Sequence, residues 1–202
     1  MSRLVIFVLP LAVVSLAAAP LPKARDKAAP FLMTREGDKK VTELRDRDSV
    51  IELVEVVTKV EKKGDSVRVT TSRQINGRST SDVTFEASAE GVFLVAVAGK
   101  ERATPRPALR LPAKQGDTWS WEEEAPGVAP AKHTYTVGKW EEVEVPAGTF
   151  QALRIGLKLD TPGAPTKTGT YWWARGVGVV KSVLDTSIGE QTAVLKSFTP
   201  TK

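Results

Sequence analysis

Few side chains in this sequence could carry out catalysis, and each of them also has an ordinary structural explanation. His133 is the single histidine of the chain, so a serine triad would have to be built on it. No Gly-x-Ser-x-Gly nucleophile elbow accompanies it. We therefore expect His133 to be an ordinary polar residue at the start of a strand. With one histidine and no cysteine, a typical zinc site lacks ligands. We therefore expect no catalytic residue, no metal and no cofactor.

Two clusters of carboxylates offer the remaining acid–base chemistry. Their members are Glu122, Glu123 and Glu124 in the first cluster and Glu141, Glu142 and Glu144 in the second. A pair drawn from them could act as the acid and the base of a glycoside hydrolase. However, Glu142 and Glu144 alternate with Val143 and Val145, a pattern that predicts the solvent-facing side of a strand. No recognisable loop spacing supports calcium binding there.

Aromatic residues could bind a ligand without catalysis. A concave sheet lined by tryptophans could hold a lipid-like molecule, a glycan or an apolar peptide. The candidate ligand-binding residues are Trp119, Trp121, Trp172 and Trp173. The alternative is that they fill the core or close the ends of a barrel. Because neighbours in a strand point to opposite faces, Trp172 and Trp173 cannot both lie in one core.

The elements that would position these residues are β-strands. Short segments rich in Val, Thr, Ile and aromatic residues are separated by Gly, Pro, Asp and Asn. Residues 153–160 alternate apolar and polar side chains, and Asn76-Gly77 predicts a hairpin turn. We expect an all-β fold of about nine to ten strands. Its single antiparallel sheet should be strongly curved or form a half-open barrel.

Residues 99–115 interrupt the strand pattern. Three prolines occur there: Pro105, Pro107 and Pro112. They exclude a helix interior and a central strand, so we expect a connection. Arg102, Arg106 and Arg110 recur every four residues, but the prolines exclude the basic helical face that this spacing would otherwise predict.

Two tetrapeptides indicate an internal repeat. Arg35-Glu36-Gly37-Asp38 and Lys114-Gln115-Gly116-Asp117 each precede the start of an expected strand. Duplication would explain the similarity. The alternative is coincidence, because Gly and Asp are common in turns.

The N-terminus predicts export. Arg3 is followed by an apolar stretch from Leu4 to Ala19, which is typical of a signal peptide. The stretch contains Pro10 and falls short of the roughly 20 apolar residues that a spanning helix needs. A retained anchor is the alternative. Small residues favour cleavage after Ala17, with a second possible site after Ala19.

The domain organisation follows from this N-terminus. We expect a signal peptide over residues 1–19, a flexible leader over residues 20–30 and one antiparallel β-domain over residues 31–202. The absence of cysteine excludes disulfides and a lipid-modified N-terminal cysteine. The net charge is +5, and the basic residues are scattered among acidic ones, which argues against a nucleic-acid partner.

The C-terminal half carries a set of motifs that suggests a family. They are Gly148-Thr149-Phe150, Tyr171-Trp172-Trp173-Ala174-Arg175-Gly176-Val177-Gly178-Val179-Val180-Lys181, and Gln115-Gly116-Asp117-Thr118-Trp119 upstream. Over residues 111–198 they resemble a group of exported bacterial domains of unknown function. That group is similar to curved half-barrels of the lipoprotein-carrier type, whose concave face can accommodate acyl chains. The resemblance implies a fold and supplies no catalytic residue.

These patterns together predict a non-enzymatic envelope protein, located in the periplasm or outside the cell. We expect it to bind a lipid-like apolar ligand, a glycan or a protein partner on a curved sheet. One alternative is a structural or assembly module that pairs through an exposed strand edge. Another is a carboxylate-based hydrolase of envelope polysaccharide. We expect no membrane-spanning segment in the mature protein.

Overall fold

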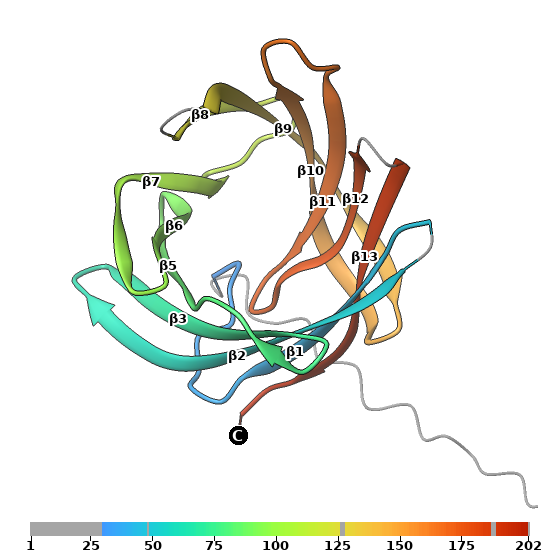
Figure 1. Ribbon diagram of the computed structural model, residues 1–202. Helices are drawn as coiled ribbons and strands as arrows, with labels where there is room; N and C mark the ends of the chain where they lie inside the picture. The colour runs from blue at the N-terminus through green and yellow to red at the C-terminus, as the bar shows by residue number, and fades with distance from the viewer. Residues whose placement is uncertain (1–29, 48, 126–127, 187–188, 202) are drawn as a thin grey trace, which may run out of the picture.

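The computed structural model describes residues 30–47, 49–125, 128–186 and 189–201 (Figure 1). Its strands are β1 (Lys39–Arg45), β2 (Val50–Lys63), β3 (Ser66–Ile75), β4 (Arg78–Ser79), β5 (Val83–Ser88), β6 (Gly91–Val97), β7 (Lys100–Arg110), β8 (Thr118–Ala125), β9 (Val128–Val145), β10 (Gly148–Asp160), β11 (Lys167–Ala174), β12 (Gly178–Thr186) and β13 (Gly189–Thr199). No helix in these ranges is long and apolar enough to cross a membrane. The predicted signal peptide lies outside the described residues, as does the predicted leader except for Pro30.

The strands form one antiparallel sheet that curls into a nearly closed barrel (Figure 1). Twelve of them follow in the order β7-β6-β5-β3-β2-β1-β13-β12-β11-β10-β9-β8, and β4 pairs with β3 beside this series. The prediction of an all-β fold with a single, strongly curved antiparallel sheet is confirmed. The expected nine to ten strands and the half-open barrel are wrong, because the sheet has thirteen strands and β7 lies where the sequence analysis expected a connection.

The sequence analysis missed β7 because this edge strand contains prolines, which argue against a strand. Most of the connection expected over residues 99–115 is in fact this strand. β7 pairs with β6 on one side only, and an edge strand does not need backbone N–H groups on its free side. Pro105 and Pro107 are therefore tolerated. The prolines exclude a central strand, as expected, but they do not exclude an edge strand.

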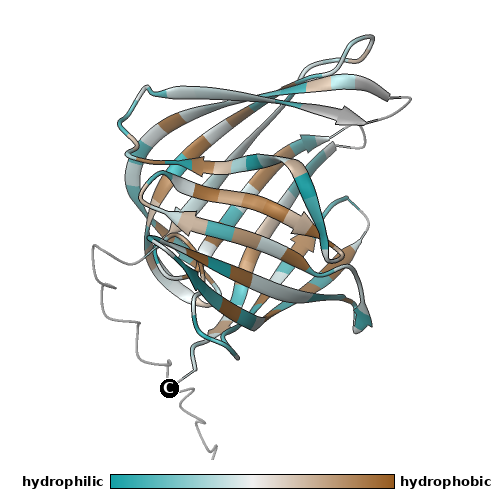
Figure 2. Cartoon of the chain, turned by 90° about the vertical axis from the view of Figure 1, so that its left-hand side faces the viewer, coloured by the Kyte–Doolittle hydropathy of each residue, from teal (hydrophilic) through white to brown (hydrophobic). Residues whose placement is uncertain are grey.

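One end of the barrel is filled by apolar side chains. Inward-facing residues alternate along the strands, and Leu153 and Ile155 of β10 are 2% and 0% exposed. Figure 2 shows this alternation as apolar and polar bands along the strands. The segment that precedes β1 adds Phe31 and Met33 to the same core. The carbonyl oxygen of Pro30 accepts a hydrogen bond of 2.6 Å from the Gly176 N–H in the β11–β12 turn. We call this end the closed end.

A second apolar cluster fixes the long β9–β10 hairpin. Val143 of β9 and Phe150 of β10 pack with Val180 and Leu195 from β12 and β13. At the hairpin tip, the backbone N–H of Ala147 donates a hydrogen bond to the carbonyl oxygen of Leu195 (3.1 Å). The tip therefore lies against β13, as Figure 1 shows at its lower right.

The two halves of the barrel repeat one another. The turn at residues 35–38 precedes six consecutively paired strands, β1-β2-β3-β5-β6-β7, and the turn at residues 114–117 precedes six more, β8 to β13. In each turn the Asp side chain accepts a hydrogen bond from the first backbone N–H of the turn. The Asp carbonyl oxygen accepts another from a buried valine, Val57 (2.9 Å) or Val137 (2.8 Å). A bulge follows each valine. These matching features support the duplication that the two tetrapeptides indicate.

Candidate functional site

The end of the barrel opposite the closed end has an apolar lining that is not fully packed. Leu53 lies two and four residues before the buried Glu55 and Val57 in β2, so its side chain also faces inward. We define the mouth as the inward-facing apolar residues that stay partly exposed at this end: Leu44, Ile51, Leu53, Ile75, Leu159 and Leu184. All six belong to strands with a neighbour on each side. Their exposure is therefore not caused by a free sheet edge.

Two of the four candidate tryptophans lie on one inner wall. Trp119 is 6% exposed and stacks on Tyr135, with 5.0 Å between the ring centroids. Trp121 is partly buried on the same face of β8 and lies 5.3 Å from the ring of His133. His133 in turn lies opposite Leu159 of the mouth. The wall is therefore continuous from Trp121 to the mouth.

The other two tryptophans separate, as their adjacency requires. Trp173 is 8% exposed and belongs to the main core with Leu153. Trp172 points to the opposite face, where its indole N–H donates a hydrogen bond to the Glu141 carboxylate and the Lys181 ammonium lies over its ring. The predicted four-tryptophan site is therefore not assembled: Trp172 lies outside the inner surface, and Trp173 is used for packing.

His133 is an internal residue of its strand and not, as expected, a polar residue at the start of one. It is 8% exposed and lies between the rings of Trp121 and Tyr135. β9 begins at Val128, earlier than the pattern indicates. Pro130 is tolerated there because β10 ends opposite Lys132, which leaves this part of β9 with a partner on one side only.

Two arginines that the sequence analysis set aside lie against the tryptophan wall. The guanidinium groups of Arg102 and Arg106 in β7 lie 5.4 and 5.2 Å from the ring centroid of Trp121. Arg106 also donates a hydrogen bond to the Tyr135 hydroxyl (3.3 Å). A cation–π contact stabilises by about 0.5–2 kcal/mol. These contacts join β7 to the wall formed by β8 and β9, although no backbone ladder between β7 and β8 is formed by the described residues. We call the junction of β7 and β8 the seam.

The shape of β7 explains why both arginines reach one ring. Leu94 of β6 pairs with Arg106, and Ala96 pairs with Glu101. The four residues of β7 between these pairs, including Arg102, bulge out of register.

Arg106 also influences the pKa of the nearby Tyr171 hydroxyl. Burial raises this pKa, Tyr135 raises it further, and Arg106 opposes the rise. The sequence signal for the common contact of the two arginines is their four-residue spacing, which the sequence analysis interpreted only as a helical face that the prolines exclude.

A pocket of about 640 Å³ opens at the seam. Its lining residues are Arg102, Ala103, Thr104, Ser120, Trp121, Glu122 and Lys132. Trp121 supplies apolar surface, Thr104 and Ser120 supply hydroxyl groups, and Arg102 and Lys132 supply positive charge. Such a mixture suits a molecule with an apolar part and a polar part.

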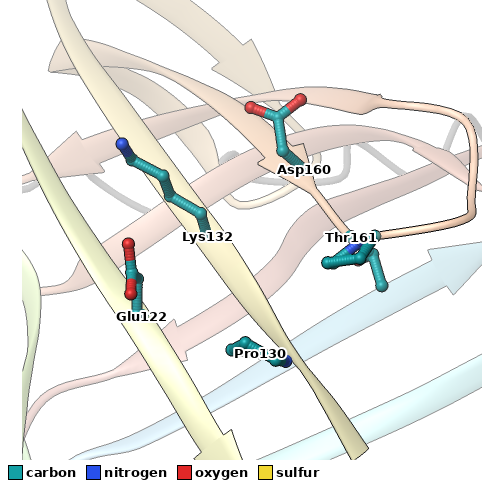
Figure 3. Close-up of a pocket in the computed structure, with 6 residues that line it drawn as sticks. Glu122, Pro130, Lys132, Asp160 and Thr161 are labelled. Carbon is teal, nitrogen blue, oxygen red and sulfur yellow. The ribbon is translucent and has the colours of Figure 1, made fainter.

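A smaller pocket of about 320 Å³ shares Glu122 and Lys132 with the first (Figure 3). Glu122, Lys132 and Asp160 lie opposite one another in β8, β9 and β10, so the lysine stands between two carboxylates. Hydrogen bonds from Thr166 (2.7 Å) and Lys158 (2.9 Å) hold the pKa of Asp160 below its ordinary value of 3.8. The lowered pKa favours the ionised form of Asp160.

The structure separates the carboxylates of the two predicted clusters. Glu142 and Glu144 are exposed on β9, as the alternation predicts. Glu122 pairs with Lys132, ten residues before Glu142 on the same strand, which amounts to roughly 30 Å along the strand. Glycosidase carboxylates lie about 5–10 Å apart. The side chains of Glu123 and Glu124 are outside the described part. Within that part, no three His, Asp or Glu side chains gather as a metal site.

The fold and the site together define a nearly closed antiparallel barrel with an aromatic and cationic seam. No protein-family model matches the chain, and no curated protein matches its sequence. A candidate exported protein with a YmcC-like fold from Bacteroides fragilis has a similar structure, with a TM-score of 0.63 at 16% identity over 85% of this chain and 99% of that one. A candidate lipoprotein from Parabacteroides distasonis has a TM-score of 0.60 at 16% identity over 86% and 100%. At this identity the likeness shows the fold alone.

Proposed function

We propose that this chain is a non-enzymatic protein of the cell envelope that binds a lipid-like molecule in the mouth of its barrel. The observation that carries the proposal is the partial exposure of inward-facing apolar side chains on strands that are paired on both sides. An apolar ligand would release water from this surface, with about 25 cal/mol gained per Å² buried. The continuous wall from Leu159 to Trp121 would let such a ligand extend to the seam.

The envelope location is supported by two independent features. The N-terminal sequence from Arg3 to Ala19 has the pattern of a signal peptide. The two structures of similar fold are named as a candidate exported protein and a candidate lipoprotein.

Pairing of a partner strand with an exposed sheet edge is the less favoured alternative. The twelve-strand series ends at β7 and β8, whose outer edges could pair with a partner strand. Pro105 and Pro107 remove N–H donors from β7, and the acidic Glu122 lies on β8. Prolines and charges at sheet edges are features that discourage pairing with other chains.

Ligand binding in the mouth can be tested with the apolar dye N-phenylnaphthylamine. Ile51→Asp places a charged side chain on the apolar inner surface that the dye would cover and should weaken dye binding at least about 10-fold. Dye fluorescence during titration measures the affinity.

Val50→Asp is the matched control. Val50 precedes Ile51 in β2, is 60% exposed and faces outward. Its substitution should leave the dye affinity unchanged. Equal affinity in the Ile51→Asp protein and the wild type, or no dye binding to the wild type, would contradict the proposal.

A further inference from the structure

The seam is the counterpart of a junction that is fully paired elsewhere in the barrel. In the repeat, β7 corresponds to β13 and β8 corresponds to β1. β13 and β1 form a ladder that runs from Lys39 opposite Thr199 to Arg45 opposite Thr192. At the seam, side-chain contacts of Arg102 and Arg106 connect β7 to β8 instead of a backbone ladder. The seam is therefore a specific departure from the repeat, and it opens onto the larger of the two pockets described above.

The two arginines at the seam lack carboxylate partners among the described residues. Arg68 and Arg73, which also lie on barrel strands, form ion pairs with glutamates at 2.7 and 2.9 Å. By contrast, no described carboxylate forms an ion pair with Arg102 or Arg106. The Nε atom of Arg102 is buried and has no hydrogen-bond partner within the described part of the chain. An unsatisfied buried donor costs about 1–3 kcal/mol, so an acceptor supplied by a ligand would be favourable there.

We infer that the seam binds the anionic head of the ligand, a phosphate or carboxylate group, while the apolar part of the ligand occupies the mouth. This inference rests on the proposed function. Guanidinium groups match the geometry of both anions, and the ring of Trp121 holds two of them at one place. Lys132, which stands between Glu122 and Asp160, also lines the pocket.

The test compares three probes on the full-length protein by tryptophan fluorescence. They are dodecyl phosphate, the neutral monododecanoylglycerol and inorganic phosphate, with both dodecyl probes below their critical micelle concentrations. Dodecyl phosphate should bind at least about 10-fold more tightly than the neutral probe, since hydrogen bonds to charged groups are the stronger ones. Inorganic phosphate alone should bind much more weakly than dodecyl phosphate.

Charge removal at the seam should act on the anionic probe alone. The double variant Arg102→Gln/Arg106→Gln should lower the affinity for dodecyl phosphate about 10- to 100-fold and leave that for the neutral probe within about 2-fold. Lys59→Gln/Lys139→Gln removes two exposed positive charges away from the seam and should change neither affinity. Lys132→Gln alters an exposed side chain and should weaken anion binding about 2- to 5-fold. This third variant keeps the test open if the arginine variant does not fold.

The outcomes separate this inference from the proposed function. Binding of both dodecyl probes with equal affinity, or unchanged dodecyl phosphate binding in the seam variants, would contradict the inferred binding of an anionic head at the seam. Either result would leave the proposed binding of an apolar ligand in the mouth unaffected. Failure of both dodecyl probes to bind would overturn the proposed function itself. If inorganic phosphate binds as tightly as dodecyl phosphate, the seam takes free anions and the inferred amphipathic ligand is wrong.

Discussion

Replacing Glu55 with glutamine should lower the free energy of unfolding by about 3 kcal/mol. Glu55 faces inward and is 5% exposed, with Lys40 at 2.8 Å and Arg73 at 2.9 Å from its carboxylate oxygens. Loss of its charge leaves two cations close together without a counterion. We expect the lower end of the range of about 3–5 kcal/mol for a broken buried pair, because part of the Arg73 side chain reaches solvent. Urea unfolding followed by tryptophan fluorescence measures the change.

The same substitution should reduce the loss of stability in acid. Burial raises the pKa of Glu55, but Lys40 and Arg73 outweigh burial and hold the pKa below its ordinary value of 4.5. A carboxyl group with a lowered folded pKa stabilises fully above its unfolded pKa. That contribution is lost as the pH falls through the folded pKa. The wild type should therefore lose stability below about pH 4.5 more steeply than the Glu55→Gln protein.

Glu61→Gln is the matched control for both measurements. Glu61 lies on the same strand and pairs with Lys59, but both side chains are largely exposed. Its substitution should change the free energy of unfolding by less than about 1 kcal/mol. If Glu55→Gln were no more destabilising than Glu61→Gln, the inward-facing charges would be stabilised mainly by solvent and not by one another.

The sequence pattern was sufficient for the fold where the alternation is simple. Residues 153–160 form most of β10, and Asn76-Gly77 forms the turn between β3 and β4 with positive φ at both residues. The pattern failed where strands lie at an edge. Pro105 and Pro107 are unfavourable in a paired strand and acceptable at a free edge, and no local signal shows which residues lie at the edge of a sheet.

The site was predictable only in part, for a related reason. The common face of Trp119 and Trp121 follows from their spacing, as does the separation of Trp172 from Trp173. The arginine pair could not be predicted, because it depends on the bulge in β7 and on the meeting of the two ends of the sheet. Arg106 and Trp121 belong to strands at opposite ends of the strand order. Only barrel closure brings them together.

Gly91→Ala should lower the free energy of unfolding by about 3–5 kcal/mol, because backbone strain and steric overlap act together. Gly91 begins β6 with a φ of +139°, a conformation that other residues rarely adopt. A Cβ atom there would lie 2.0 Å from the carbonyl oxygen of Leu109 in β7. A backbone atom cannot turn aside as a flexible side chain can. β7 would have to move away from β6.

Gly99→Ala separates strain from overlap at the other end of the β6–β7 pair. Gly99 has a φ of +72°, and a Cβ atom there would meet nothing within 4 Å, so strain alone should cost about 1–2 kcal/mol. Because β7 carries Arg102 and Arg106, its displacement by Gly91→Ala should also weaken dodecyl phosphate binding, whereas Gly99→Ala should preserve it. A Gly91→Ala protein that kept wild-type affinity for this probe would show that the position of β7 does not determine the seam.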